Sequence, residues 1–197
     1  MSSFLAFPVP PGGWLAKLPP TPKGTRLMAG ADLHLTVAFL GALDEPRARH
    51  AFSVLAAEPI ARVFGTLGEV VPLGPPRRPS AVAALCDART ETGQPLEEAI
   101  LAQREHALAA AGLPQESRDP LPHITLARPG RSVADRRSAL DWASRIDLEQ
   151  APIRLERFAL YRSVRRRNAL ERGGPRFEIL DSVELPTASR RDESRPE

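Results

Sequence analysis

Two octapeptides with one residue pattern, HLTVAFLG at residues 34–41 and HITLARPG at residues 123–130, decide how this chain of 197 residues folds. Each reads His-apolar-Thr-apolar-Ala-x-x-Gly, and together they hold two of the four histidines in the chain. Alternate residues of a β-strand point to the same face. The pattern therefore predicts that histidine and threonine project together, while the apolar residues between them enter a core.

The segments around the octapeptides repeat in the same order, which indicates two similar halves. A strand, a connection, the His-x-Thr strand, a helix and a further strand occur over roughly residues 3–73 and again over roughly residues 80–162. Strands alternating with helices favour an α/β or α+β build and exclude an all-β sandwich. We expect strands at 3–9, 34–40, 66–74, 80–88, 122–128, 153–163 and 176–185, and helices at 45–64, 95–113 and 132–146.

Composition limits the class of protein. The formal net charge is +3, 42% of the residues are apolar, and Cys86 is the single cysteine. No apolar run approaches the roughly 20 residues of a membrane span, and the first residues do not resemble a signal peptide, so we expect a cytoplasmic protein with no membrane partner. One cysteine cannot form an internal disulfide, and its apolar neighbours predict a buried, unreactive thiol.

Residues 1–186 are expected to form one domain with two lobes, and residues 187–197 a disordered tail.

Positive charge is concentrated near the end of the chain. Residues 162–176 contain six arginines and one glutamate. The planar guanidinium donates two parallel hydrogen bonds to two phosphate oxygens, which suits a phosphate-binding loop. A solvated loop without a ligand explains the same charge equally well.

The paired His-x-Thr strands suit acid–base chemistry on a phosphate. A neutral imidazole takes a proton from an attacking hydroxyl, a protonated one gives a proton to the leaving oxygen, and the ordinary histidine pKa of about 6.5 permits both. Threonine hydroxyls between them can donate hydrogen bonds to phosphate oxygens. A single His-x-Thr is more typical of a histidine at a sheet edge without a catalytic role, but two matched copies favour one shared site. Zinc is a weaker interpretation, because no cysteine pair or third ligand accompanies the two histidines.

The octapeptides resemble the two signature motifs of the 2H phosphoesterase superfamily, in particular the LigT-like RNA 2',3'-cyclic phosphodiesterases, also called 2'-5' RNA ligases. SFLAFPVP at residues 3–10 is similar to the first strand of that family, and FALYRS and RFEILDSVEL to its closing strand pair. The resemblance implies an α+β fold with two pseudo-twofold-related lobes of mostly antiparallel sheet and outer helices around a central cleft.

The resemblance also implies an activity and its residues. It implies opening of a terminal 2',3'-cyclic phosphate on RNA to a 2'-phosphomonoester, without metal or nucleotide cofactor. We also expect a monomer. His123 would activate water as the base, and His34 would protonate the departing 3' oxygen. Thr36 and Thr125 would hold the phosphate oxygens. The reverse reaction with an RNA 5'-hydroxyl would form a 2'-5' linkage.

Phe39 and Arg128 lie at the same offset from the two motif histidines and are candidate substrate-binding residues. Relatives carry arginine in the frame of Arg128, where it would clamp the phosphate. An odd offset in a regular strand turns a side chain away from the histidine face, so a core position is favoured for Phe39 over base stacking. The same parity argues against Arg128, unless Pro129 and the end of the strand redirect it.

Two other functions remain open. Related 2H enzymes act on small cyclic nucleotides or ADP-ribose cyclic phosphate, which is the nearer alternative. A non-catalytic module that binds RNA ends is the alternative from another class. Binding alone would not need a matched acid and base, so intact histidines and threonines in both motifs favour an enzyme.

Overall fold

The computed structural model describes residues 1–58, 60–76, 78–164 and 174–186. Its elements are strands β1 (Ser3–Pro8), β2 (Thr25–Leu27), β3 (His34–Gly41), β4 (Val63–Leu73), β5 (Ala81–Thr90), β6 (His123–Pro129), β7 (Pro152–Leu155), β8 (Arg157–Ser163) and β9 (Phe177–Glu184), helices α1 (Glu45–Ala56), α2 (Leu96–Ala110) and α3 (Val133–Ala143), and the short 3-10 turns η1 (Leu15–Lys17) and η2 (Gly30–Asp32). The tail expected at residues 187–197 lies outside the described residues.

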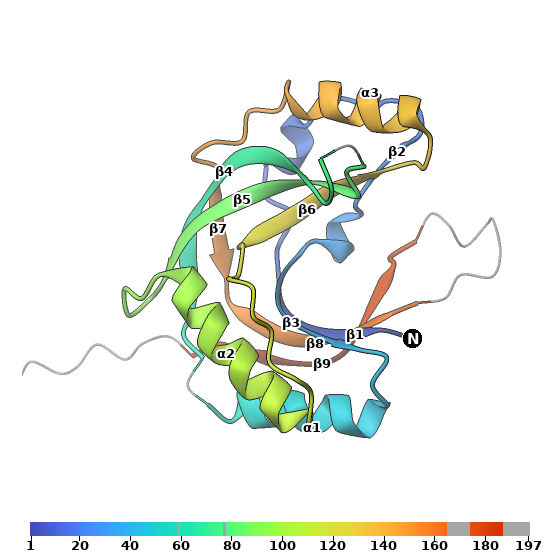
Figure 1. Cartoon of the computed structure of the whole chain (residues 1–197). Coiled ribbons are helices and arrows are strands. Elements are labelled where there is room, and N and C mark those ends of the chain that lie inside the picture. Colours follow the sequence, from blue (N-terminus) through green and yellow to red (C-terminus); the bar gives the residue numbers. More distant parts are fainter. Residues whose placement is uncertain (59, 77, 165–173, 187–197) are drawn as a thin grey trace, which may run out of the picture.

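The strands form one curled antiparallel sheet with the two motif strands at its centre (Figure 1). Its order is β7-β4-β5-β6-β3-β1-β8-β9, and β2 pairs with β6 beside this path. The helices lie on the outer side of the curl: α2 packs against β3, α1 against α2 and β8, and α3 against β2, β4 and β6. The expected α+β class and the mostly antiparallel sheet are confirmed.

The two halves of the chain exchange their last strands. Each motif strand pairs with the first strand of its own half, β3 with β1 and β6 with β5. The strand that follows the helix crosses over, so β4 pairs with β5 of the second half and β8 pairs with β1 of the first. The repeat seen in the sequence is therefore present, but each lobe of the sheet contains strands from both halves.

Local sequence signals set the starts of two helices. The Asp44 side chain accepts a hydrogen bond from the Arg47 amide at 3.0 Å, which caps α1. Ser132 and Asp135 form a reciprocal capping box at the start of α3. These caps satisfy backbone amides that have no partner within the helix.

Two sequence-based boundaries are wrong. The helix expected over residues 45–64 ends at Ala56, and Val63 instead begins β4, where it pairs with Thr90 of β5 and Leu155 of β7. The strand expected over residues 153–163 is two strands, because β7 pairs with β4 whereas β8 pairs with β1. In both cases pairing with distant strands overrides the local pattern.

The three-residue strand β2 has no counterpart among the elements expected from the sequence. It pairs Arg26 with Arg128 and Leu27 with Ala127, at the end of the second motif strand. A strand this short carries too few residues to show an alternating pattern.

Apolar side chains pack on both faces of the sheet. The main core, which includes Leu35 and Ile124, lies between the sheet and the helices. A smaller cluster of Phe4, Ala6, Ala159 and Tyr161 lies on the concave face, with Phe177 packed against it. The concave face is therefore apolar beside the first motif strand.

Cys86 is buried, and its burial raises the pKa of the thiol to about 12, as expected for an unreactive side chain.

Among the described residues, every helix is too short or too polar to cross a membrane.

Candidate active site

The two motif strands meet at one residue pair. Leu35 of β3 lies opposite Ile124 of β6 in an antiparallel register, and both side chains are fully buried. The same register places His34 across from Thr125, and Thr36 across from His123. Cross-strand neighbours have Cβ atoms about 4.5–5.5 Å apart.

These two histidines and two threonines are all half-buried, so they share the accessible face of the sheet. The structure thus brings together the four residues expected to act on a phosphate. We call them the motif quartet below.

Both histidines are held by the same local hydrogen bond. His34 Nδ1 lies 2.7 Å from the carbonyl oxygen of Asp32, and His123 Nδ1 lies 2.6 Å from that of Leu121. A carbonyl oxygen only accepts, so Nδ1 must carry the hydrogen in each ring. That tautomer leaves the lone pair on Nε2, and each ring can therefore take a proton there.

Aromatic rings enclose the imidazole of His34. Ring centroids of Phe4, Phe177 and Tyr161 lie 4.7, 5.1 and 5.5 Å from its own, and Phe177 meets it edge-on. This apolar surrounding disfavours the charged imidazolium.

The pKa of His34 falls to about 4 as a result of this burial. The carbonyl and the charge of Asp32 oppose the fall, while the nearby positive charges of Arg128 and His123 add to it. His34 is therefore neutral in the free protein near pH 7.

A β-bulge in each motif strand determines which face the next residues occupy. Along β3, Thr36 pairs with Ala6 and Ala38 with Leu5, so Val37 is an extra residue without a partner on β1. A bulge of this kind reverses the alternation of faces beyond it.

The second motif repeats the arrangement. Along β6, Thr125 pairs with Ala83 and Ala127 with Val82, so Leu126 is the extra residue. The reversal of faces therefore occurs at the same offset from both motif histidines.

The core position expected for Phe39 is wrong for this reason. Beyond the bulge Phe39 pairs with Phe4 on the face that carries His34, and its side chain is 64% exposed. The two phenylalanine rings lie 5.9 Å apart. Phe39 is thus on the accessible face, available to stack against a ligand.

Arg128 lies on the histidine face of β6 and is half-buried. Burial and the charge of Arg176 lower the pKa of its guanidinium. Its buried Nε has no hydrogen-bond partner in the part of the chain that the structure describes. An unmet donor beside two imidazoles favours an anionic ligand.

A cavity of about 460 Å³ opens next to the quartet. Thr36, Phe39 and His123 line one side of it, and α2 and the segment before β6 line the other. Its volume is sufficient for a nucleotide-sized ligand.

The arginine-rich segment contributes less to the described structure than its charge suggested. Arg162 forms ion pairs with Glu45 and Glu178 at 2.8 and 2.9 Å, so it is already neutralised. The arginines at 165–167 and 172 lie outside the described residues. The interpretation as a phosphate-binding loop stays a prediction.

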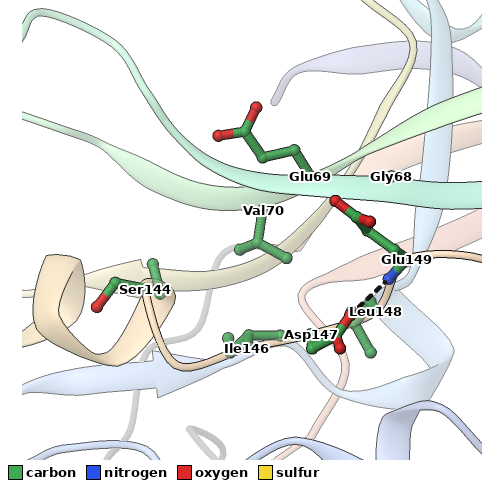
Figure 2. Close-up of a pocket in the computed structure, with 9 residues that line it drawn as sticks. Gly68, Glu69, Val70, Ser144, Ile146, Asp147, Leu148 and Glu149 are labelled. Carbon is green, nitrogen blue, oxygen red and sulfur yellow. Dashed lines mark hydrogen bonds between the residues drawn. The ribbon is translucent and has the colours of Figure 1, made fainter.

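A second cavity is unsuited to a phosphate. It lies between the middle of β4 and the segment after α3, and Figure 2 shows the carboxylates of Asp147 and Glu149 on the side of β4 that faces this segment. Their two negative charges repel an anionic substrate. Within the described residues, no group of three or more His, Cys, Asp or Glu side chains is placed to hold a metal ion.

Asp32 and the aromatic rings around His34 were not among the site residues expected from the sequence. Asp32 precedes the first motif by two residues and is only 2% exposed. An acidic residue so close to an apolar strand start was the available signal. Phe177 and Tyr161 come from distant strands and carried no signal near the motif.

Comparisons with known proteins agree with this fold. A family model described as LigT like Phosphoesterase matches residues 90–170, which include the second motif but not the first. The protein TT0787 of Thermus thermophilus has a similar structure, with a TM-score of 0.61 and 25% sequence identity over 96% of this chain and 100% of that one.

Escherichia coli LigT is also similar. Its complex with 3'-AMP has a TM-score of 0.65 and 23% identity over 93% of this chain and 97% of that one. Its apo form has a TM-score of 0.63 and 21% identity over 93% and 96%. No match is found among the curated proteins.

Proposed function

Since the chain is a LigT-like 2H phosphoesterase by its family-model match and its fold, we propose that it is a 2',3'-cyclic phosphodiesterase that acts on RNA ends. The product would be a 2'-phosphomonoester with a free 3'-hydroxyl. The observation that carries this proposal is the motif quartet, in which Nδ1 of both histidines carries the hydrogen and Nε2 is left free to exchange a proton.

The phosphate is proposed to lie between the two motif strands. Thr36 and Thr125 would donate hydrogen bonds to its non-bridging oxygens, and the unmet Nε of Arg128 would add a charged donor. The base of the terminal nucleotide would enter the neighbouring cavity, where Phe39 offers an exposed ring. The complex of Escherichia coli LigT with 3'-AMP supports a nucleotide-sized ligand.

The proposed reaction is one in-line displacement at phosphorus. Nε2 of His123 takes a proton from water as the water oxygen bonds to phosphorus, and the bond from phosphorus to the 3' oxygen breaks. Nε2 of His34 gives its proton to that oxygen. Water is consumed, His123 ends protonated and His34 neutral, and exchange with solvent restores both.

The acid role requires His34 to gain a proton when substrate binds. In the free protein its pKa is about 4, so most molecules carry a neutral ring near pH 7. A phosphate anion next to Nε2 favours the charged imidazolium and raises the pKa. We therefore expect substrate or inorganic phosphate to bind together with a proton.

Sulfur substitution tests which histidine is the acid. A cyclic phosphate with sulfur in place of the bridging 3' oxygen has a leaving group that needs no protonation. With this substrate His34→Ala should recover most of its lost rate, whereas His123→Ala should remain slow. Recovery in His123→Ala alone would reverse the two roles.

The substrate class is tested with three compounds side by side. We expect the highest kcat/KM for an RNA oligonucleotide with a 2',3'-cyclic phosphate end, followed by a mononucleoside 2',3'-cyclic phosphate and ADP-ribose cyclic phosphate. A preference for either small molecule would favour the alternative of a small-molecule phosphodiesterase. Binding of RNA ends without any product would favour a non-catalytic module.

Ligation is proposed as the same displacement with a different nucleophile, and it uses the same groups. An RNA 5'-hydroxyl in place of water would give a 2'-5' linkage, detectable when a cyclic-phosphate end and a 5'-hydroxyl end are annealed on a splint.

A cytoplasmic location and a monomeric state stay predictions.

No metal is proposed, because the side chains supply both proton transfer and charge stabilisation. Activity should persist after extensive dialysis against EDTA. Loss of activity that zinc or magnesium restores would contradict this part of the proposal.

A further inference from the structure

Asp32 is a buried carboxylate with an unusual set of partners. It is 2% exposed, and in the described part of the chain it forms no ion pair. Its Oδ1 instead accepts hydrogen bonds from the backbone amides of Arg176 at 2.7 Å and Phe177 at 3.1 Å, where β9 begins. Such charge-assisted bonds satisfy a carboxylate that has left water.

The same residue also holds the first motif histidine. The carbonyl oxygen of Asp32 accepts the hydrogen bond from His34 Nδ1 at 2.7 Å. Phe177, whose amide the carboxylate binds, places its ring edge-on against the imidazole at 5.1 Å. Two separate contacts of His34 therefore depend on one residue.

We propose that Asp32 is the positioning residue of His34: its backbone carbonyl fixes the imidazole tautomer, and its carboxylate fastens the start of β9 to the first motif, which seats Phe177 against the ring. This inference deepens the proposed function, on which its catalytic meaning rests. The carboxylate also places a negative charge near an imidazole that must become positive to act as the acid.

The charges around His34 make the effect of the Asp32 charge on the pKa of His34 measurable. Asp32 raises the pKa of His34, whereas Arg128 and His123 lower it, and Arg176 lies beside Arg128. The remaining close neighbours are rings, of which only Tyr161 can ionise, and burial raises its pKa. Near neutral pH, Asp32 is the negative charge that acts on the imidazole among the described residues.

His123 provides a contrast within the same molecule. Its Nδ1 bonds to the carbonyl of Leu121, in the segment that precedes β6. That segment is fastened by Arg104, whose guanidinium donates to the Arg118 carbonyl at 2.7 Å and to Glu116 at 3.3 Å. Its anchor is a cation from α2, so a change at Asp32 should affect His34 and leave His123 unchanged.

Imidazole nitrogen NMR on the free protein tests the proposal without any turnover. In Asp32→Asn the amide oxygen can still accept from both backbone amides, but the charge is gone. We expect the Nδ1–H tautomer of His34 to persist and its pKa to fall by roughly one unit. Asp44→Asn is the matched control, because Asp44 also accepts from a backbone amide but caps α1 away from the imidazole.

Asp32→Ala removes the anchor itself. We expect the ring of Phe177 to leave His34, seen as loss of the nuclear Overhauser contact between the two rings, while the Nδ1–H tautomer persists because the backbone carbonyl remains. We also expect kcat to fall by roughly tenfold or more with a smaller change in KM. The His34 signals keep the test informative even if the variant is less stable, because Asp32→Asn gives an independent readout.

The outcomes separate the two proposals. An unchanged His34 pKa in Asp32→Asn, or a retained contact between the rings of His34 and Phe177 in Asp32→Ala, would overturn the positioning role. If the NMR changes occur but the wild-type protein opens no cyclic phosphate, the positioning role stands and the proposed function fails.

Discussion

Val37 and Leu126 hold equivalent places in the two halves of the molecule: each is the unpaired residue of a β-bulge, three positions after a motif histidine. The bulges return Phe39 and Arg128 to the face of the sheet that carries the histidines. Without them, regular alternation would turn both side chains toward the core. The duplicated bulge is thus the reason that each motif supplies three accessible positions instead of two.

The first prediction concerns the two histidines. His34→Ala and His123→Ala should each lower kcat by roughly two to four orders of magnitude, because each removes one proton-transfer partner. Circular dichroism should show that the fold survives. His106→Ala is the control, since His106 lies at the surface against Glu58 and should be dispensable. Near-wild-type turnover in either motif variant would remove that histidine from the mechanism.

The second prediction links His34 to stability. In the unfolded chain His34 takes up a proton near its ordinary pKa of 6.5, but in the folded protein only near about 4. The unfolded state therefore binds more protons in this window, so the free energy of unfolding should fall as the pH is lowered from about 6.5 to about 4. Protonation of His34 lowers the free energy of unfolding by at most roughly 3 kcal/mol over this pH range.

Urea unfolding at several pH values measures this contribution. His34→Gln cannot titrate, so its free energy of unfolding should depend less on pH than that of the wild type. His106→Gln should keep the wild-type dependence. Equal slopes for wild type and His34→Gln would show that burial does not lower the pKa of His34.

The third prediction concerns Arg128. Arg128→Ala should lower kcat/KM by roughly a hundredfold, because a charged donor to the phosphate is lost. The loss should be the same for RNA and for a mononucleoside cyclic phosphate, since both contain the reacting phosphate. Arg131→Ala provides the control three residues further on, where the side chain is exposed. A comparable loss in that variant would point to general charge instead of a specific contact.

The fourth prediction assigns base stacking to Phe39. Phe39→Ala should raise KM for nucleoside 2',3'-cyclic phosphates by roughly tenfold, the usual effect of losing one base–aromatic contact. Ribose 2,3-cyclic phosphate, which has no base, should be unaffected. Stability should change little, because the ring is 64% exposed. Phe64→Ala, at a partly exposed ring on β4, is the control, and equal effects of the two variants would argue against stacking.

The centre of the molecule could be predicted from local sequence. The His-x-Thr pattern predicted two strands and the face that each histidine shares with its threonine, because side-chain alternation in a strand depends only on local geometry. That the two strands share one site followed from the match between the two copies.

The features that could not be predicted depend on distant pairing. The bulges at Val37 and Leu126 exist only in relation to β1 and β5, and the split between β7 and β8 only in relation to β4 and β1. The carboxylate of Asp32 binds amides 144 and 145 residues further along the chain. No pattern confined to a short window carries such information.

The exchange of β4 and β8 makes the two halves mutually dependent for folding. A fragment that ended after β4 would hold that strand without β5, and its β1 would lack β8 on one edge. Neither this fragment nor the remaining one could bury its sheet edges alone, but a chain nicked between β4 and β5 should reassemble from its two pieces. The motif strands therefore meet only when both halves are present, so activity recovered on mixing the fragments would report their association directly.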